Sequence, residues 1–417
     1  MCAMASGIEK KVVLAPQATK GTIPAANLNT AQYLRRVTSS LNVTKETYQS
    51  NEMRADRQIA DFRHGVQSVE GSITGELSPG TYKLLMAAIL RKDFVAAKIG
   101  GPESDITAAS TSGAAGTFTS KATATFITDG LKVGDVVRWT GFTTTGAGNN
   151  NRNFLITALE QKVMTGIMLD GNPVVAKAET AAVTATGVGK KTWTPATAHT
   201  ENWFAVEHYF SDVDLSEVFY DLKVNSMAIK LPATGLATVD FGLMGLNYAN
   251  KASSDAPYFT SVLAAATSGI LAAVNGALYV QGTKVALLTG LDFDVAANLS
   301  SEPVVGSNVK PDIFDGRVAV KGNMTVFFED ATFRDYFLNE TEVSINCVFT
   351  TGTEANADFI AFTMPRVKVG GASKDDGEKG LVQTMPFTAL FNSSGDDGTT
   401  NTATSLATTL SIQDSKA

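Results

Sequence analysis

The sequence is poor in the residues from which most catalytic and metal sites are built. Its 417 residues include only three histidines and two cysteines. Cys2 and Cys347 are too few for a disulfide framework or a zinc site and are expected to be inert, and so low a number is typical of a protein that folds in a reducing cytoplasm. His64, His199 and His208 show no metal-ligand spacing, and no nucleophile stands at a recognisable distance from a base. We therefore predict no enzyme activity, no metal and no cofactor.

Positive charge and long apolar runs are also scarce. The 34 Lys and Arg residues are outnumbered by 41 Asp and Glu residues, and no basic cluster stands out, so a nucleic-acid-binding surface is not expected. No stretch reaches the roughly 20 apolar residues that span a bilayer, and no signal-peptide pattern follows the first charges. The acidic turn at Asp375, Asp376 and Glu378 lacks the EF-hand pattern, so we expect a solvated turn rather than a calcium site.

What the sequence does contain is alternation. Apolar residues make up 44% of the chain, and short alternating runs separated by Gly, Asn, Ser and Thr predict a mainly β protein of two or three domains. The clearest unit is residues 66–90. Residues 69–77 alternate as a half-buried strand, and Ser78 and Pro79 suit the start of a helix. The apolar stripe of that helix consists of Tyr82, Leu85, Met86 and Ile89.

This unit recurs 251 positions later, where residues 320–328 repeat the strand pattern and residues 332–337 the helix pattern. The change from period 2 to period 3.6 falls at the same place in both stretches. Six pairs between positions 61 and 86 are identical, where average composition would give roughly one or two. Upstream, a predicted strand at 33–43 is echoed at 289–295, and downstream GLATVDFGL from Gly235 resembles GLVQTMPFTA from Gly380. The identical pairs are Asp61/Asp312, Gly65/Gly316, Val69/Val320, Gly71/Gly322, Thr74/Thr325 and Thr81/Thr332.

The repeat predicts the domain organisation. We expect an extended N-terminal arm at 1–30 that docks on a neighbour, a first unit split into 31–100 and 201–250, and a second unit with a C-terminal tail at 278–417. We expect an inserted small β domain at 101–200. Its first part, up to residue 120, has a linker-like composition, and short β runs between Gly- and Asn-rich turns predict a compact barrel of about five strands at 120–185. Residues 251–277 would link the units, with a short helix at 258–266.

Each unit also contains a long loop, at residues 44–65 and 298–316. Loops of this length in compact domains are usually functional or disordered. Their presence in both units suggests contact with another subunit, whereas a solvated loop of no particular role is the alternative. The candidate ion-pair residues are Arg54, Arg57, Asp61 and Asp312.

Three stretches, RADRQIADFRHGVQSVEGSITGELSPGTYKLLMAAIL, DLKVNSMAIKLPATGLATVDFGLMG and VAVKGNMTVFFEDATFRDYFL, resemble the major tail tube proteins of long, non-contractile (siphovirus-type) bacteriophage tails. LKVGDVVRWTGFTTTGAGNNNRNFLITAL is similar to a small decorating domain found in some of them. The resemblance implies an all-β fold with short flanking helices, in which two tandem β-sandwich units contribute strands to an inter-subunit β-barrel. It implies a structural virion protein that is assembled in the host cytoplasm and self-assembles into stacked rings.

The partners implied by the resemblance are further copies of the chain, a tape-measure protein, tail terminator and tip proteins, and genomic DNA that passes through the lumen. Many family members carry one unit per chain and form six-membered rings. Two units per chain would let three chains supply six positions, so we expect a trimeric ring with pseudo-sixfold symmetry. The predicted channel residues, on the polar strand faces, are Glu70, Glu76, Asp292 and Asp294.

Other readings stay open at this point. The polar strand faces could be ordinary solvated surfaces. The chain could be a tube protein of a bacterial secretion or contractile-injection machine, or a β-sandwich adhesin that binds glycans. Against the adhesin, Trp139, Trp193 and Trp203 do not cluster in the sequence as a stacking platform would.

Overall fold

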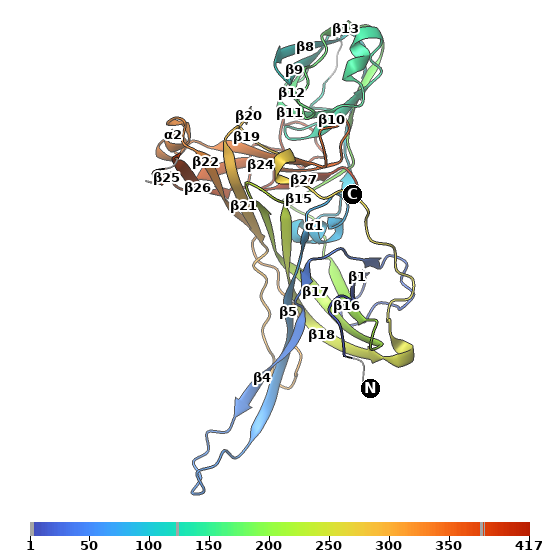
Figure 1. The fold of residues 1–417 in the computed structure, drawn as a ribbon, viewed down its shortest axis with the longest axis vertical. Helices are drawn as coiled ribbons and strands as arrows, with labels where there is room; N and C mark the ends of the chain where they lie inside the picture. The colour runs from blue at the N-terminus through green and yellow to red at the C-terminus, as the bar shows by residue number, and fades with distance from the viewer. Residues whose placement is uncertain (1–3, 122–124, 376–377, 379) are drawn as a thin grey trace.

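The computed structural model describes residues 4–121, 125–375, 378 and 380–417. Within these residues the chain is mainly β, with one large sheet, one smaller sheet, two α-helices and three short 3-10 helices. Figure 1 shows three parts: a central body, a small domain at one end of it, and a long hairpin that projects from the other end. The expected all-β fold with short helices is confirmed.

The first half of the large sheet has the neighbour order β4, β5, β18, β17, β16, β1. Two short strands lie beside it, β2 on β1 and β3 on β5. The bounds are β1 Lys10–Gln17, β2 Gln32–Tyr33, β3 Thr38–Ser39, β4 Asn42–Gln49, β5 Phe62–Glu76, β16 Trp203–Phe210, β17 Leu215–Leu231 and β18 Thr238–Ala252.

The second half has the order β21, β22, β26, β24, β23, β19. The two halves form one continuous sheet because β17 also pairs with β21, from Ser226 opposite Ala296 to Leu231 opposite Leu291. The bounds are β19 Gly276–Val280, β20 Thr283–Lys284, β21 Leu288–Ala296, β22 Ala319–Phe327, β23 Val343–Thr350, β24 Phe359–Val369, β25 Ser373–Lys374, β26 Val382–Ala389 and β27 Ser411–Asp414.

The helix expected after Ser78 begins later than predicted. Helix α1 spans Lys83–Leu90 with Tyr82 at its N-cap, so Ser78 is not the cap. Gly80 has a φ of 75°, which a helix cannot continue through, and the Ser78 hydroxyl instead bonds Thr81 Oγ1 at 2.7 Å. The predicted stripe is buried. Helix α2, Thr332–Leu338, has no buried residue.

The small sheet has the order β13, β8, β9, β12, β11, β10, β14, β7. Five of these strands, β10 to β14, come from the stretch predicted as a five-stranded barrel. The other three, β7 to β9, come from residues 99–120, where the predicted linker is wrong: its small Gly, Ala, Ser and Thr side chains give a strand no readable apolar period. Its own core stacks Phe118 on Trp139 at 4.6 Å between ring centroids. The bounds are β7 Ile99–Glu103, β8 Ile106–Ser112, β9 Ala115–Ser120, β10 Val136–Thr140, β11 Asn153–Leu159, β12 Val163–Met168, β13 Lys177–Glu179 and β14 Val183–Gly187, with a 3-10 turn at Thr144–Asn149. Flanking it, β6 Val95–Ala96 pairs with β15 Lys190–Trp193 in the large sheet.

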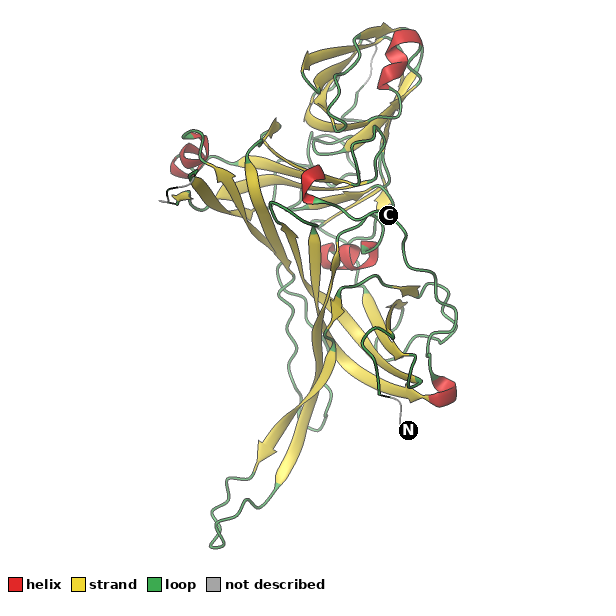
Figure 2. Cartoon of the chain, in the orientation of Figure 1, coloured by secondary structure: helices red, strands yellow, loops and turns green. Residues whose placement is uncertain are grey.

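The loop expected at 44–65 is shorter than predicted, because both of its ends are strand. Strands β4 and β5 continue into the projecting hairpin, and only residues 50–61 form its loop (Figure 2). Their backbone groups are satisfied by each other, so this pair needs no apolar face and shows no alternation. The strand expected at 33–43 is broken into β2, β3 and the start of β4. Between β3 and β4, the Leu41 backbone lies 2.6 Å from where a Cβ on Gly71 would be, so only glycine fits at position 71.

Two further expectations differ from the structure. Within the expected arm, β1 is a core strand: Val12 and Leu14 face the main core, while Val13 and Ala15 pack on a second cluster that includes Phe259. A strand buried on both faces shows no alternation. The short helix expected at 258–266 is also wrong. These residues are extended, and bonds such as Leu263 N to Ala31 O (2.8 Å) satisfy their backbone.

Candidate functional site

One face of the central sheet is polar from β5 to β26. Residues directly opposite one another across these strands form rows, and each row alternates with a buried apolar row, such as that of Val239, Ile229 and Phe293. The buried rows belong to the main core, whereas every residue of the two central polar rows is exposed or half-buried. The two central polar rows are Glu76, Thr238, Lys230, Asp292, Asn323 and Pro386, and Thr74, Asp240, Ala228, Asp294, Lys321 and Thr388.

The four carboxylates predicted from the sequence lie on this face. Glu70 and Asp294 are exposed, whereas Glu76 and Asp292 are half-buried. Asp292 accepts a hydrogen bond of 3.1 Å from Asn323 Nδ2. These residues come from different halves of the chain, and the β17–β21 pairing brings them onto one surface.

Sequence reasoning missed several charges on the same face. Asp240 accepts a 2.5 Å hydrogen bond from the Thr74 hydroxyl, and Lys230 lies directly opposite Asp292. Lys368, on β24, is paired with Glu340 at 3.2 Å. Leaving that pair aside, the polar face carries five carboxylates and two ammonium groups. These are Glu70, Glu76, Asp240, Asp292 and Asp294, and Lys230 and Lys321. The alternation TVDFG in β18 already placed Asp240 on the polar side, and only the pairing of β17 was needed to add Lys230.

The central sheet ends in two edges that pair on one side only. At one end, β4 is hydrogen-bonded to β5; at the other, β25 is hydrogen-bonded to β26. Among the described residues neither strand has a partner on its outer side. An unpaired edge is a ready template for another strand, so the two ends of the sheet are candidate surfaces for a second copy.

The predicted ion-pair residues are spread over the projecting hairpin and the loop beside it. Arg54 pairs with Asp56 at 3.0 Å and Asp61 with Arg63 at 2.8 Å, both near the hairpin tip. Asp312 is bound within the chain, to Lys20 at 2.9 Å. Arg57 has a φ of 58° and lies in the tip itself. The structure does not bring these four side chains together, and Met53 is fully exposed beside them.

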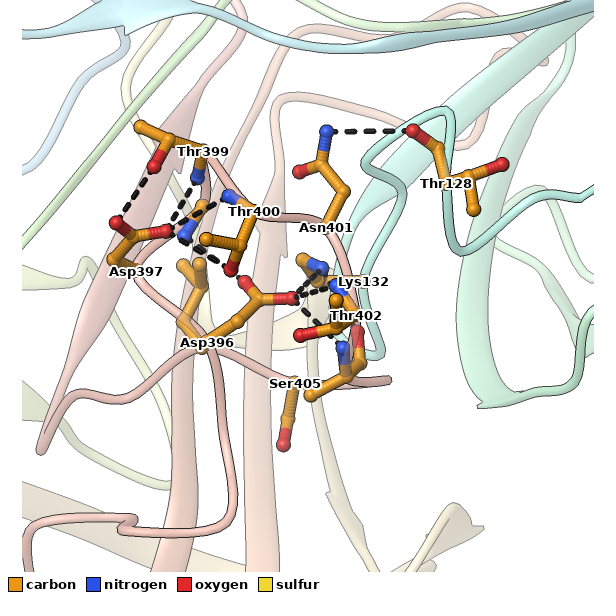
Figure 3. A network of polar contacts seen from close by, with 12 residues as sticks. Thr128, Lys132, Asp396, Asp397, Thr399, Thr400, Asn401, Thr402 and Ser405 are labelled. Carbon is orange, nitrogen blue, oxygen red and sulfur yellow. Dashed lines mark hydrogen bonds and ion pairs between the residues drawn. The ribbon is translucent and has the colours of Figure 1, made fainter.

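A buried polar network attaches the small domain to the C-terminal segment (Figure 3). Lys132 Nζ lies 2.7 Å from Asp396 Oδ2, and both side chains are almost fully buried. The same oxygen accepts bonds from the backbone amides of Thr402 and Ala403. Burial alone would raise the pKa of Asp396, but the bonds from Lys132 and the amides hold it below its ordinary value. The network is structural: it fixes how the small domain is held.

The described residues offer little for chemistry. Cys347 is fully buried, which raises the pKa of its thiol, whereas Cys2 lies outside the described residues. His208 is buried and bonds the Ser39 hydroxyl at 2.8 Å, and burial lowers its pKa. No group of three His, Cys, Asp or Glu in the described part is placed to hold a metal ion; Asp376, in the acidic turn, lies outside that part. No helix in it is long and apolar enough to cross a membrane.

Two comparisons with known proteins bear on the family of the chain. A search of curated proteins found no match. The sequence model of the phage tail tube protein family, in contrast, matches residues 7–389, nearly the whole chain. This is a family of structural components of the virion tail that assemble from copies of themselves. The match spans the central sheet, the small domain and both free edges, and the chain therefore belongs to the phage tail tube protein family.

Proposed function

We propose that the chain self-assembles into stacked rings of three subunits that form the tail tube of a siphovirus-type phage, and that the polar sheet face lines a channel for DNA. The observation that supports this proposal is that the two halves of the central sheet cross their strands in the same order and are joined edge to edge by β17 and β21. Assembly would take place in the host cytoplasm, around a tape-measure protein and between tail tip and terminator proteins.

The strand pairing supports the duplication more strongly than sequence identity does. Starting from Val69 in the first half and Val320 in the second, the residues directly opposite can be followed across each half of the sheet. Both rows cross the strands in the same order. Both also end at a register shift: the pair after Phe204 and Leu222 is Val206 and Phe219, and the pair after Val343 and Val367 is Ile345 and Met364, so one strand advances by two residues and the other by three. The first row is Val43, Val69, Gly245, Leu222 and Phe204, and the second is Val295, Val320, Ala389, Val367 and Val343.

The internal junction supports a ring of three chains. Inside the chain, β17 of the first unit pairs with β21 of the second. The second unit's counterpart of β17 is β24 with β25, and the first unit's counterpart of β21 is β3 with the start of β4. These are the strands at the two open ends of the sheet. Pairing β25 with β4 of the next chain would repeat the internal junction between chains. Head-to-tail contacts of this kind close into a ring when the rotation is right, and six units need only three chains.

The polar face is the surface that such a ring would turn inward, because the buried rows on the opposite face are covered by α1 and the outer strands. Carboxylates in excess repel the DNA backbone, whereas each lysine that met a phosphate would release counterions and hold the DNA. The projecting hairpin, with Arg54, Arg57 and Asp61, would reach the next ring, and Asp312 lies in the loop beside it.

Electron microscopy of the purified protein tests the proposal. We expect tubes, or single rings, with three chains per ring and six similar densities around the axis. Six whole chains per ring would refute the trimer and leave the tube. A protein that stays monomeric at high concentration, and gives no tubes with its tail tip present, would refute the assembly function itself.

A further inference from the structure

The surface around α2 is incomplete within one chain. A cavity of about 300 Å³ opens between α2, the end of β22 and the segment after β20. Apolar side chains such as Leu287, Phe327 and Phe333 line one part of it, and Lys284, Glu329 and Asp330 line another. Phe327 in the lining and Leu381 outside it keep 43% and 40% of their surface exposed. Next to it, Phe328 N donates to Leu381 O at 2.9 Å. The matching groups of this pair, Phe328 O and Leu381 N, have no hydrogen bond within the described residues.

The corresponding place beside α1 is filled by the chain itself. There, Leu77 N donates to Ala237 O at 2.8 Å, as Phe328 N does to Leu381 O. The remaining two groups of the pair are both used, because Leu271 N donates to Leu77 O and Ala237 N donates to Leu271 O. Leu271 is fully buried. The segment before β19 thus enters as an extra strand and closes the first unit.

The preceding residues of the same segment cover the position that the cavity occupies beside α2. Arg35 Nη1 bonds Ser268 O at 2.7 Å, and the Ser268 hydroxyl bonds Pro79 O. Ser268 therefore bridges the connection after β2 and the turn before α1. In the second unit, the connection after β20 and the turn before α2 are the two walls of the open cavity.

The register of the sheet identifies which segment of a neighbouring chain would take this role. Strand β1 occupies in the first unit the place that β19 occupies in the second: Leu14 lies opposite Val206, as Val280 lies opposite Ile345. Residues before β1 therefore correspond to residues before β19, with an offset of 266. Ala5 takes the place of Leu271.

The local structure before the two strands agrees with this register. Glu9 N donates to Ser6 O at 3.1 Å, and at the corresponding position Asn275 N donates to Ala272 O, also at 3.1 Å. The same turn thus precedes both strands. Residues before this turn project from the chain: Met4 is 90% exposed, and the amide and carbonyl of Ala5 have no hydrogen bond within the described residues.

We propose that residues 4–6 of one chain add as a strand to Phe328 and Leu381 of the next chain, beside α2, as residues 271–272 do beside α1. This inference rests on the proposed ring, in which the second unit of each chain meets the first unit of its neighbour. The Ala5 amide donates to the Phe328 carbonyl, the Leu381 amide donates to the Ala5 carbonyl, and Met4 covers exposed apolar side chains around the cavity. Each chain thereby closes the next.

A pair of disulfides tests the contact. Inside the chain, Leu236 and Ala272 form an antiparallel bridge, and their counterparts are Gly380 and Ser6 of the neighbour. Opposed strand residues lie within the distance that a disulfide needs. The test variant carries Ser6→Cys and Gly380→Cys, and the matched control carries Leu236→Cys and Ala272→Cys, both in a Cys2→Ser background. A Cβ at position 380 meets only the Phe327 ring, at 3.3 Å.

After mild oxidation of tubes, we expect the test variant to run as covalent trimers on a non-reducing gel, and the control as an internally cross-linked monomer. Tubes in which the control cross-links and the test variant stays monomeric would overturn the docking while leaving the tube intact. Products larger than trimers would place the contact between rings and overturn it as well. Failure of the unmodified protein to assemble would instead refute the proposed function.

A second variant covers the case in which the cysteines disturb assembly. Ala5→Pro removes the amide donor, and Ala5→Ser keeps it. We expect Ala5→Pro to raise the protein concentration needed for tube formation about tenfold, as for one lost interfacial hydrogen bond, and Ala5→Ser to leave it unchanged. Equal critical concentrations for the two variants would contradict the proposed strand.

Discussion

The channel face can be tested by reversing its charge. Replacing Glu70, Glu76, Asp292 and Asp294 with lysine changes the net charge of the face, outside the Lys368 pair, from minus three to plus five per chain. Each lysine that meets a phosphate adds one released counterion to the binding equilibrium. With four such contacts per ring, lowering the salt from about 200 to about 50 mM would strengthen DNA binding by roughly 150-fold per ring.

We therefore expect virions with the four substitutions to have tails of normal length but to eject DNA slowly or incompletely, and more so at low salt, where screening is weakest. The measurement is the ejection rate, followed by fluorescence of a dye that binds released DNA, at several ionic strengths. Glu70→Lys alone is the cleanest single change, because Glu70 is exposed and lies opposite the uncharged Asn42 and Met244.

Glu160→Lys is the matched control, since Glu160 is exposed on the small domain. Like Glu70→Lys, it changes the net charge by two units per chain, but on a surface that we place outside the channel. Ejection at about 50 mM salt that is equally fast in the wild type, the control and the fourfold variant would refute the assignment of this face to the channel. Short or absent tails in the Glu70→Lys virions would show instead that the face serves assembly.

Three further predictions concern stability and the small domain. Burial raises the pKa of Asp414 to about 6, so the free energy of unfolding should fall by about 3 kcal/mol as pH rises from about 4 through 6; Asp414→Asn should remove this dependence in denaturant titrations. Lys132→Met leaves Asp396 buried without its cation, and should destabilise the protein by about 3–5 kcal/mol in the same assay, with partial recovery on adding Asp396→Asn. A variant joining Ala97 directly to Gly189 should still form tubes in electron micrographs, because neither open edge lies in the deleted segment; a folded variant without tubes would contradict this.

The sequence predicted the parts of the fold in which one face is buried and the other is not. Strand β5 alternates because Val69 and Ile73 enter the core while Glu70 and Ser72 do not. That period is readable because burial changes at every residue. The same cause makes β1 unreadable, since both of its faces are covered, and makes the outer part of β4 unreadable, since neither of its faces is.

The candidate site was predictable residue by residue but not as a surface. Alternation predicted that Glu70 and Asp294 each lie on the polar face of a strand. The sequence of neither strand predicts that β17 joins the two halves of the sheet, which is what places both residues on one surface. The comparison of Gly235 with Gly380 was also displaced by one residue, because strand pairing aligns Ala237, and not Leu236, with Leu381. Register is fixed by the partner strand and by bulges, which a pairwise comparison of short segments does not contain.

The two helices show why one unit is finished in the monomer and the other is not. Helix α1 buries five side chains and α2 buries none, although the same strand and turn lead into each. One difference is the linker strand at Leu271, which packs beside α1, whereas no described residue takes that place beside α2. A chain with an open apolar site and two open edges risks random association. Lys45 and Glu46 on β4 and Lys374 on β25 are exposed at those edges, and charged edges disfavour pairing with a strand that does not match. Assembly would then start only where register, turn and charge agree at once, which is a condition that another copy of this chain meets.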